Sequence, residues 1–129
     1  MSFDWIEYLE LAKNLEASPG SLGSEEASYR SATSRAYYAV LHRASELAQA
    51  EGYISCGSGD DHQGIARHFR ESKNGEIRKK IGSDLDRMRR SRNQADYDQR
   101  LSQSPRAMAS LTIKTAERLV KNLETMTPD

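Results

Sequence analysis

The chain has 129 residues, 36% of them hydrophobic, and a formal net charge of zero. We expect one domain spanning residues 1–129, long enough to bury a core without disulfides or metal ions. The balanced charge means that any argument for nucleic-acid binding must rest on local charge.

No run of residues is long and apolar enough to cross a membrane, and acids stand at the start, where a signal peptide needs basic residues. A single cysteine, Cys56, excludes an internal disulfide. We therefore expect a cytoplasmic protein.

Apolar residues at helical spacing, separated by helix breakers, predict helices from the start of the chain. Ser2 is expected to cap a first helix over residues 3–16, which ends before the breaker at 18–21. Ser24 is expected to cap a long second helix that reaches about Gln49. Small residues are frequent in the buried stripe of this helix, which favours close packing of a neighbour. The stripe comprises Tyr29, Thr33, Ala36, Val40, Ala44 and Leu47.

Three further helices are predicted in the second half of the chain. A short helix begins at Asp60 or Asp61, and a long helix spans residues 76–97. Ser104 followed by Pro105 predicts the start of the last helix, because proline is well tolerated at the first helical position. The expected buried stripes are Ile65, Ala66 and Phe69, then Ile77, Ile81, Leu85 and Met88, then Met108, Leu111, Thr115, Leu119, Leu123 and Met126.

The pattern of four long amphipathic helices and one short helix, without alternating strand patterns, predicts an all-α fold. Short loops favour an antiparallel up-and-down bundle. In that bundle the stripe of the helix at 76–97 is expected to pack against the stripe of the second helix and against Leu111 or Leu119.

Polar residues of the second helix share one face beside its apolar stripe. Ser31, Arg35, Tyr38 and His42 follow one another at spacings of four, three and four residues. This face is either a solvated surface with aromatic packing or part of a binding site.

Arg92 lies in phase with a buried stripe, four residues after Met88. A buried arginine must be paired, and Asp96, one helical turn later, is the nearest candidate. Tyr38 or His42 would complete the network. Between Arg78 and Arg100 there are eight basic and four acidic residues, which gives either a phosphate-attracting edge or a solvated helix face.

No metal or cofactor motif is found in the sequence. His62 and His68 are six residues apart, which is poor spacing for one helical metal site, and no carboxylate completes a ligand set. Phosphate-binding glycine loops are missing as well. We therefore expect no cofactor.

Three short segments together resemble the HEPN superfamily, in particular its small uncharacterised prokaryotic members. They are Ser-Arg-Ala-Tyr-Tyr-Ala at 34–39, His-Gln-Gly at 62–64 and Arg-Asn-Gln-Ala-Asp-Tyr at 92–97. The resemblance covers most of the chain, in the same order and spacing. It implies a four- to five-helix bundle that commonly dimerises, with the last segment facing a cleft between protomers.

The resemblance also implies a function, since many HEPN proteins are metal-independent ribonucleases. Their arginine is thought to hold the phosphate, while a histidine four to six residues later assists attack by the ribose 2′-hydroxyl. Many are toxins or defence effectors, often encoded beside a small nucleotidyltransferase antitoxin. This sequence departs from the pattern, because Tyr97 stands where the shortest motif has histidine and no histidine follows Arg92. A tyrosine with its ordinary pKa of about 10 is a poor proton shuttle at neutral pH.

Three hypotheses follow from these residues. In the first hypothesis, the domain is a nucleotide-, RNA- or partner-binding module without enzymatic activity. In the second, it is a metal-independent ribonuclease toxin in which His42 or His62 replaces the missing histidine. In the third hypothesis, the arginine, aspartate and tyrosine form a purely structural network. The candidate catalytic residues are Arg92, Asn93 and His42. The candidate binding residues are Arg35, Tyr38, His42, His62, Arg92, Asn93, Asp96 and Tyr97.

Overall fold

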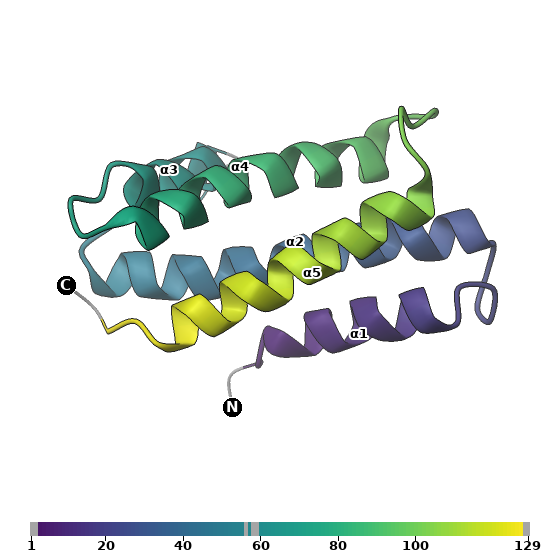
Figure 1. Ribbon diagram of the computed structural model, residues 1–129, viewed down its shortest axis with the longest axis horizontal. Helices are drawn as coiled ribbons and strands as arrows, with labels where there is room; N and C mark the ends of the chain where they lie inside the picture. Colours follow the sequence, from purple (N-terminus) through teal and green to yellow (C-terminus); the bar gives the residue numbers. More distant parts are fainter. Residues whose placement is uncertain (1–2, 56, 58–59, 128–129) are drawn as a thin grey trace.

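The computed structural model describes residues 3–55, 57 and 60–127. This part of the chain forms five α-helices and contains no strand, which confirms the all-α prediction. The helices are α1 (Ile6–Ala17), α2 (Glu25–Ala50), α3 (Asp60–Arg70), α4 (Glu76–Tyr97) and α5 (Pro105–Glu124). Helices α1, α2, α4 and α5 alternate in direction along the bundle, and the shorter α3 lies beside α4 at one end (Figure 1). In the described part of the chain, no helix combines the length and apolar character needed to span a membrane.

Helix α2 is the centre of the bundle and packs against each of the other four helices. Figure 1 shows it between α1 and α4 and behind α5. Its inward side is built largely of alanines that are fully buried, which lets neighbouring helices approach closely. These alanines are Ala32, Ala36, Ala39, Ala44 and Ala48.

Two of the three serines predicted to cap helix N-termini, Ser24 and Ser104, do so in the structure. Oγ of Ser24 accepts a hydrogen bond from the backbone N–H of Ala27 at 3.1 Å, and Ser104 caps α5 in the same way. The first helix begins at Ile6, later than predicted. Oδ1 of Asp4 accepts the backbone N–H of Ile6 at 3.1 Å, while Ser2 lies outside the described residues.

The core forms where the predicted stripes meet. Ile81, Leu85 and Met88 belong to the same buried cluster as Ala36, Val40 and Leu119. This confirms the expected packing and selects Leu119, since Leu111 is 56% exposed.

The stripe of α4 departs from the prediction at its first residue. Ile77 is 57% exposed, and the next residue, Arg78, is buried instead. The guanidinium of Arg78 forms an ion pair with the buried carboxylate of Glu51 and lies 5.1 Å from the centre of the Phe69 ring. The buried acid thus draws a basic side chain inward and turns Ile77 towards solvent.

The opposite end of α4 is held by Arg30 of α2. Its guanidinium donates hydrogen bonds to the backbone carbonyls of Ala95 at 3.1 Å, Asp98 at 2.5 Å and Gln99 at 3.2 Å. Carbonyls at a helix C-terminus lack hydrogen-bond donors within the helix, and the guanidinium of Arg30 supplies such donors here. This contact fixes the position of the last turns of α4.

Candidate ligand-binding site

Arg92 is buried at the junction of α2 and α4, with only 8% of its surface exposed. The central carbon of its guanidinium lies 5.3 Å from the ring centre of Tyr38, 5.6 Å from that of Tyr37 and 5.9 Å from that of Tyr97. The faces of aromatic rings attract cations, so these rings stabilise a charge that has left bulk water.

The ion pair predicted between Arg92 and Asp96 is present, but it is long. Nη1 of Arg92 lies 3.9 Å from Oδ2 of Asp96, and the same oxygen accepts a hydrogen bond from Oγ of Ser34 at 3.1 Å. In addition, the buried Nε of Arg92 has no hydrogen-bond partner. Buried donors are normally paired, so the described residues satisfy the guanidinium of Arg92 only in part.

Arg89, one turn before Arg92 on α4, is a residue that the sequence analysis missed. Its Nε is also buried without a hydrogen-bond partner, and among the described residues Arg89 has no ion pair. The three-residue spacing between Arg89 and Arg92 was the available signal, because it places both on neighbouring positions of one helix face.

His62 of α3 joins this cluster through Tyr37. Nδ1 of His62 lies 2.8 Å from the hydroxyl oxygen of Tyr37, and its ring also contacts Tyr38. Burial raises the pKa of Tyr37 well above its ordinary value, so its hydroxyl keeps its proton. Burial, followed by the charges of Arg92 and Arg89, lowers the pKa of His62, which favours a neutral ring. With Tyr37 as donor, the His62 proton is assigned to Nε2.

A second row of side chains continues the site across α2 towards α1. The guanidinium carbon of Arg35 lies 4.8 Å from the ring centre of Tyr8 and 5.0 Å from that of Tyr38. His42 is stacked on Trp5 with ring centres 3.5 Å apart. Burial and then the charge of Arg35 lower the pKa of His42. The predicted polar face of α2 is therefore partly covered by Tyr8 of α1 and by Trp5, which directly precedes α1.

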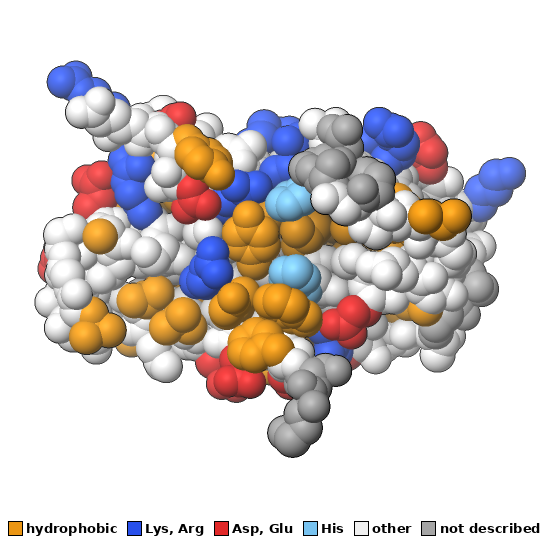
Figure 2. Space-filling view, turned by 180° about the vertical axis from the view of Figure 1, so that it is seen from behind, with side chains coloured by type: hydrophobic (Ala, Val, Ile, Leu, Met, Phe, Trp, Pro, Cys, Tyr) orange, Lys and Arg blue, Asp and Glu red, His pale blue; other side chains and the backbone are white. Residues whose placement is uncertain are grey.

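Two hollows border this group of side chains. One, of about 390 Å³, lies between α1 and α2 and includes Ser34, Arg35 and Asp96 in its lining. The other, also about 390 Å³, lies between α2 and α3 and includes His42 and His62. Figure 2 shows a face of the molecule on which two histidines lie among hydrophobic side chains, with basic side chains close by. A ligand can therefore approach the cluster from solvent.

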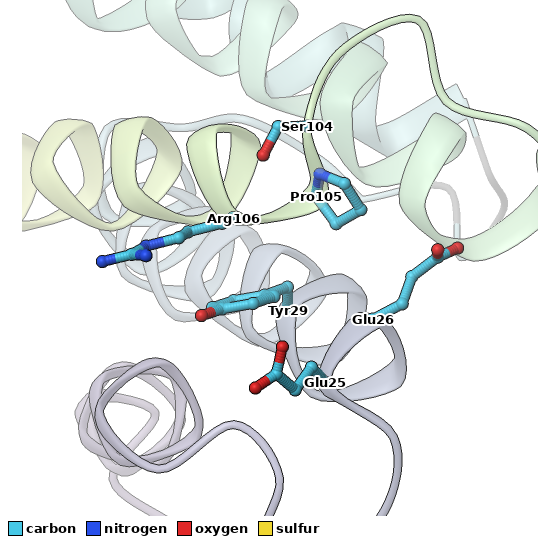
Figure 3. Close-up of a pocket in the computed structure, with 6 residues that line it drawn as sticks. All are labelled: Glu25, Glu26, Tyr29, Ser104, Pro105 and Arg106. Atoms are coloured by element: carbon cyan, nitrogen blue, oxygen red, sulfur yellow. The ribbon is translucent and has the colours of Figure 1, made fainter.

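Another pocket, of about 320 Å³, lies where the first turns of α2 and α5 meet. Figure 3 shows the ring of Tyr29 between Glu25 and Arg106, with Ser104 and Pro105 above it. Acids in a first turn and a serine cap are ordinary features of helix starts, so these residues have a structural explanation.

The structure brings together seven of the eight predicted binding residues. They are Arg35, Tyr38, His42, His62, Arg92, Asp96 and Tyr97. Asn93 is half-buried and makes no side-chain hydrogen bond within the described part of the chain. Among the described residues, no group of three or more histidine, cysteine, aspartate or glutamate side chains is arranged to hold a metal ion.

Fold and site together define a small all-helical bundle protein with a buried arginine at a cluster of aromatic side chains. The model of the HEPN domain family matches residues 8–126, nearly the whole chain, and the protein belongs to this family. No curated protein and no solved structure gives a significant match.

Proposed function

We propose that this HEPN domain binds RNA or nucleotides through Arg92 and the basic and aromatic side chains grouped with it, which are Arg35, Tyr38, His42, His62 and Tyr97. The observation that carries the proposal is the buried guanidinium of Arg92, which has one long ion pair and an unpartnered Nε. Guanidinium groups bind phosphate through paired, charge-assisted hydrogen bonds. Tyrosine and histidine rings stack on unpaired bases, so the surrounding side chains suit single-stranded RNA.

The test is binding of a short, fluorescently labelled single-stranded RNA, followed by anisotropy. Arg92→Met keeps most of the side-chain volume and removes the charge, and we expect binding to weaken about tenfold or more. Arg90→Met is the matched control, because it removes the same charge from an exposed position two residues away. Equal binding by both variants would refute the proposal.

The same variants separate the proposal from a purely structural network. In that alternative, Arg92→Met lowers the thermal midpoint and leaves no specific binding defect. We expect the reverse, because Asp96 keeps its hydrogen bond from Ser34 when Arg92 is removed.

The proposed working unit is a homodimer. HEPN domains often dimerise, and Tyr97 is 75% exposed although its ring contacts the buried Arg92. A second copy packed on this aromatic residue would remove apolar surface from water. We expect light scattering to show a dimer at a protein concentration of tens of micromolar, on the order of ordinary dimer affinities. A monomer at that concentration would contradict the proposed dimer.

We propose that the protein is the HEPN member of a toxin–antitoxin or defence system. Its protein partner would then be a small nucleotidyltransferase antitoxin. An adjacent nucleotidyltransferase gene, and loss of toxicity when the two proteins are produced together, would support this setting.

A metal-independent ribonuclease is the second candidate, favoured by the position of His62. The rings of Tyr37 and Tyr38 contact both His62 and Arg92, so a histidine from α3 lies in the same cluster as the arginine. In this case wild-type protein cleaves RNA in the presence of a chelator, and His62→Gln abolishes cleavage while weakening RNA binding less than Arg92→Met does. Binding without cleavage favours the non-enzymatic module.

A further inference from the structure

Arg89 and Arg92 form a pair of guanidinium groups that the local acids do not neutralise. Each has a buried Nε without a hydrogen-bond partner. Arg92 has the single long contact with Asp96, and Arg89 has no ion pair among the described residues. The two arginines are three residues apart on one face of α4, and a bound anion would supply acceptors that they lack among the described residues.

The two acids of α4 that precede Arg89 by one or two turns form ion pairs with other residues. Asp86, one turn before Arg89, forms its ion pair with Arg70 of α3. Asp84 is buried and binds Arg87 at 2.7 Å and Arg118 at 2.8 Å. Neither acid is thus available to balance Arg89, although both lie on the same helix.

The charges of Arg89 and Arg92 both affect His62 and Tyr37. Both arginines lower the pKa of His62 through their charge, after the larger effect of burial. The Tyr37 ring beneath Arg92 carries the hydroxyl that contacts His62. Arg92 and the imidazole of His62 therefore contact the same two tyrosine rings, and Arg89 lies one turn before Arg92 on the same face of α4.

We propose that Arg89 and Arg92 together bind a phosphate monoester, the terminal phosphate of an RNA or a nucleotide, in preference to an internal phosphodiester. This deepens the proposed function and rests on it. A terminal phosphate carries nearly two negative charges at neutral pH, because its second pKa is about 6, whereas a diester carries one. Two guanidinium groups balance a dianion and offer more donors than one diester can accept.

The experiment compares one RNA sequence with different ends at pH 7.5. The ends are a hydroxyl, a phosphate, and a phosphate methyl ester that carries a single charge. Phosphate at the 5′ end, phosphate at the 3′ end and a free nucleoside monophosphate are separate arms that distinguish the sources of the monoester. We expect at least one phosphate-bearing probe to bind about tenfold more tightly than its methyl ester.

Arg89 is tested by three substitutions. Arg89→Met should remove the preference for the phosphate end, so that the phosphate-ended RNA and its methyl ester bind with the same affinity. Arg89→Lys keeps the charge but loses the fork of donors, and should retain part of the preference. Arg90→Met, the control at an exposed position, should leave the preference intact. Thermal melting checks each fold, and Arg89→Lys carries the test if Arg89→Met does not fold.

The outcomes separate this inference from the function on which it rests. If RNA binds through Arg92 but its end makes no difference, or if Arg89→Met behaves like Arg90→Met, the two-arginine site is refuted and RNA binding stands. If neither RNA nor nucleotide binds, both proposals fail.

Discussion

The hydroxyl oxygen of Tyr37 lies 2.8 Å from Nδ1 of His62, and this contact joins the middle of α2 to the start of α3. Tyr37 is 1% exposed, so its hydroxyl has no access to bulk water as an alternative partner. The bond therefore serves two purposes, since it satisfies a buried polar group and sets the orientation of the His62 ring.

Tyr37→Phe removes this hydrogen bond without opening a large cavity. Nδ1 of His62 then loses its donor, and we expect the free energy of unfolding to fall by about 1–2 kcal/mol. Tyr38→Phe is the matched control, because the Tyr38 hydroxyl makes no hydrogen bond in the described part of the chain, and it should cost less than about 0.5 kcal/mol. Urea unfolding measures both; equal losses would show that the contact with His62 contributes little.

Stability should fall as the pH is lowered from neutrality, in part because of His42 and His62. The pKa of each is lower in the folded state than the ordinary value of about 6.5. Below pH 6.5 the unfolded chain therefore takes up protons that the folded chain does not, and this contribution to stability is lost as the pH falls towards the folded-state pKa values. His42→Gln and His62→Gln should each reduce the loss of thermal stability between pH 7.5 and pH 5. If both variants lose as much stability as the wild type, the histidines do not carry this effect.

Arg30→Met should loosen the end of α4. It removes the donors to the carbonyls of Ala95, Asp98 and Gln99, and we expect a cost of about 1–3 kcal/mol in urea unfolding. Amide hydrogen exchange should rise in the last turn of α4. Arg43→Met is the control, since its ion pair with Glu124 is 3.9 Å long and half-exposed, and its cost should stay within about 0.5 kcal/mol. Unchanged exchange at the end of α4 in Arg30→Met would show that this helix end is held by other contacts.

The fold could be predicted because its signals are local. Helix breakers, serine caps and apolar spacing predicted the approximate bounds of α4 and the starts of α2 and α5. The prediction was wrong for Ile77 and Leu111, whose spacing matches the stripes although both are exposed. At Ile77 the cause lies in Glu51, 26 residues earlier, which draws Arg78 inward.

The site could be predicted where its residues share a helix and, between helices, for the contact of Tyr38 with Arg92. Arg92 in phase with an apolar stripe, and Asp96 one turn later, are visible in the sequence. The stacking of Trp5 on His42 and the hydrogen bond between Tyr37 and His62 join residues that are far apart in the sequence, so no local pattern contains these contacts. Arg89 was overlooked although it lies three residues before Arg92, because this spacing does not show that its Nε will be buried.

Asp96 offers a test in which the proposed function and a structural network predict opposite results. Its carboxylate is the single acid paired with Arg92 among the described residues. Asp96→Asn keeps the shape of the side chain and its ability to accept the hydrogen bond from Ser34, but removes the negative charge. If the site binds the phosphates of RNA, loss of this competing charge should tighten binding about threefold, in the range of a partly exposed ion pair.

Asp98→Asn, which changes an exposed carboxylate just beyond α4, controls for the change in net charge and should have a smaller effect. Anisotropy with the same RNA, together with thermal melting, gives both readouts. A lower melting temperature without tighter binding in Asp96→Asn would show that the pair with Arg92 stabilises the fold and does not tune a binding site.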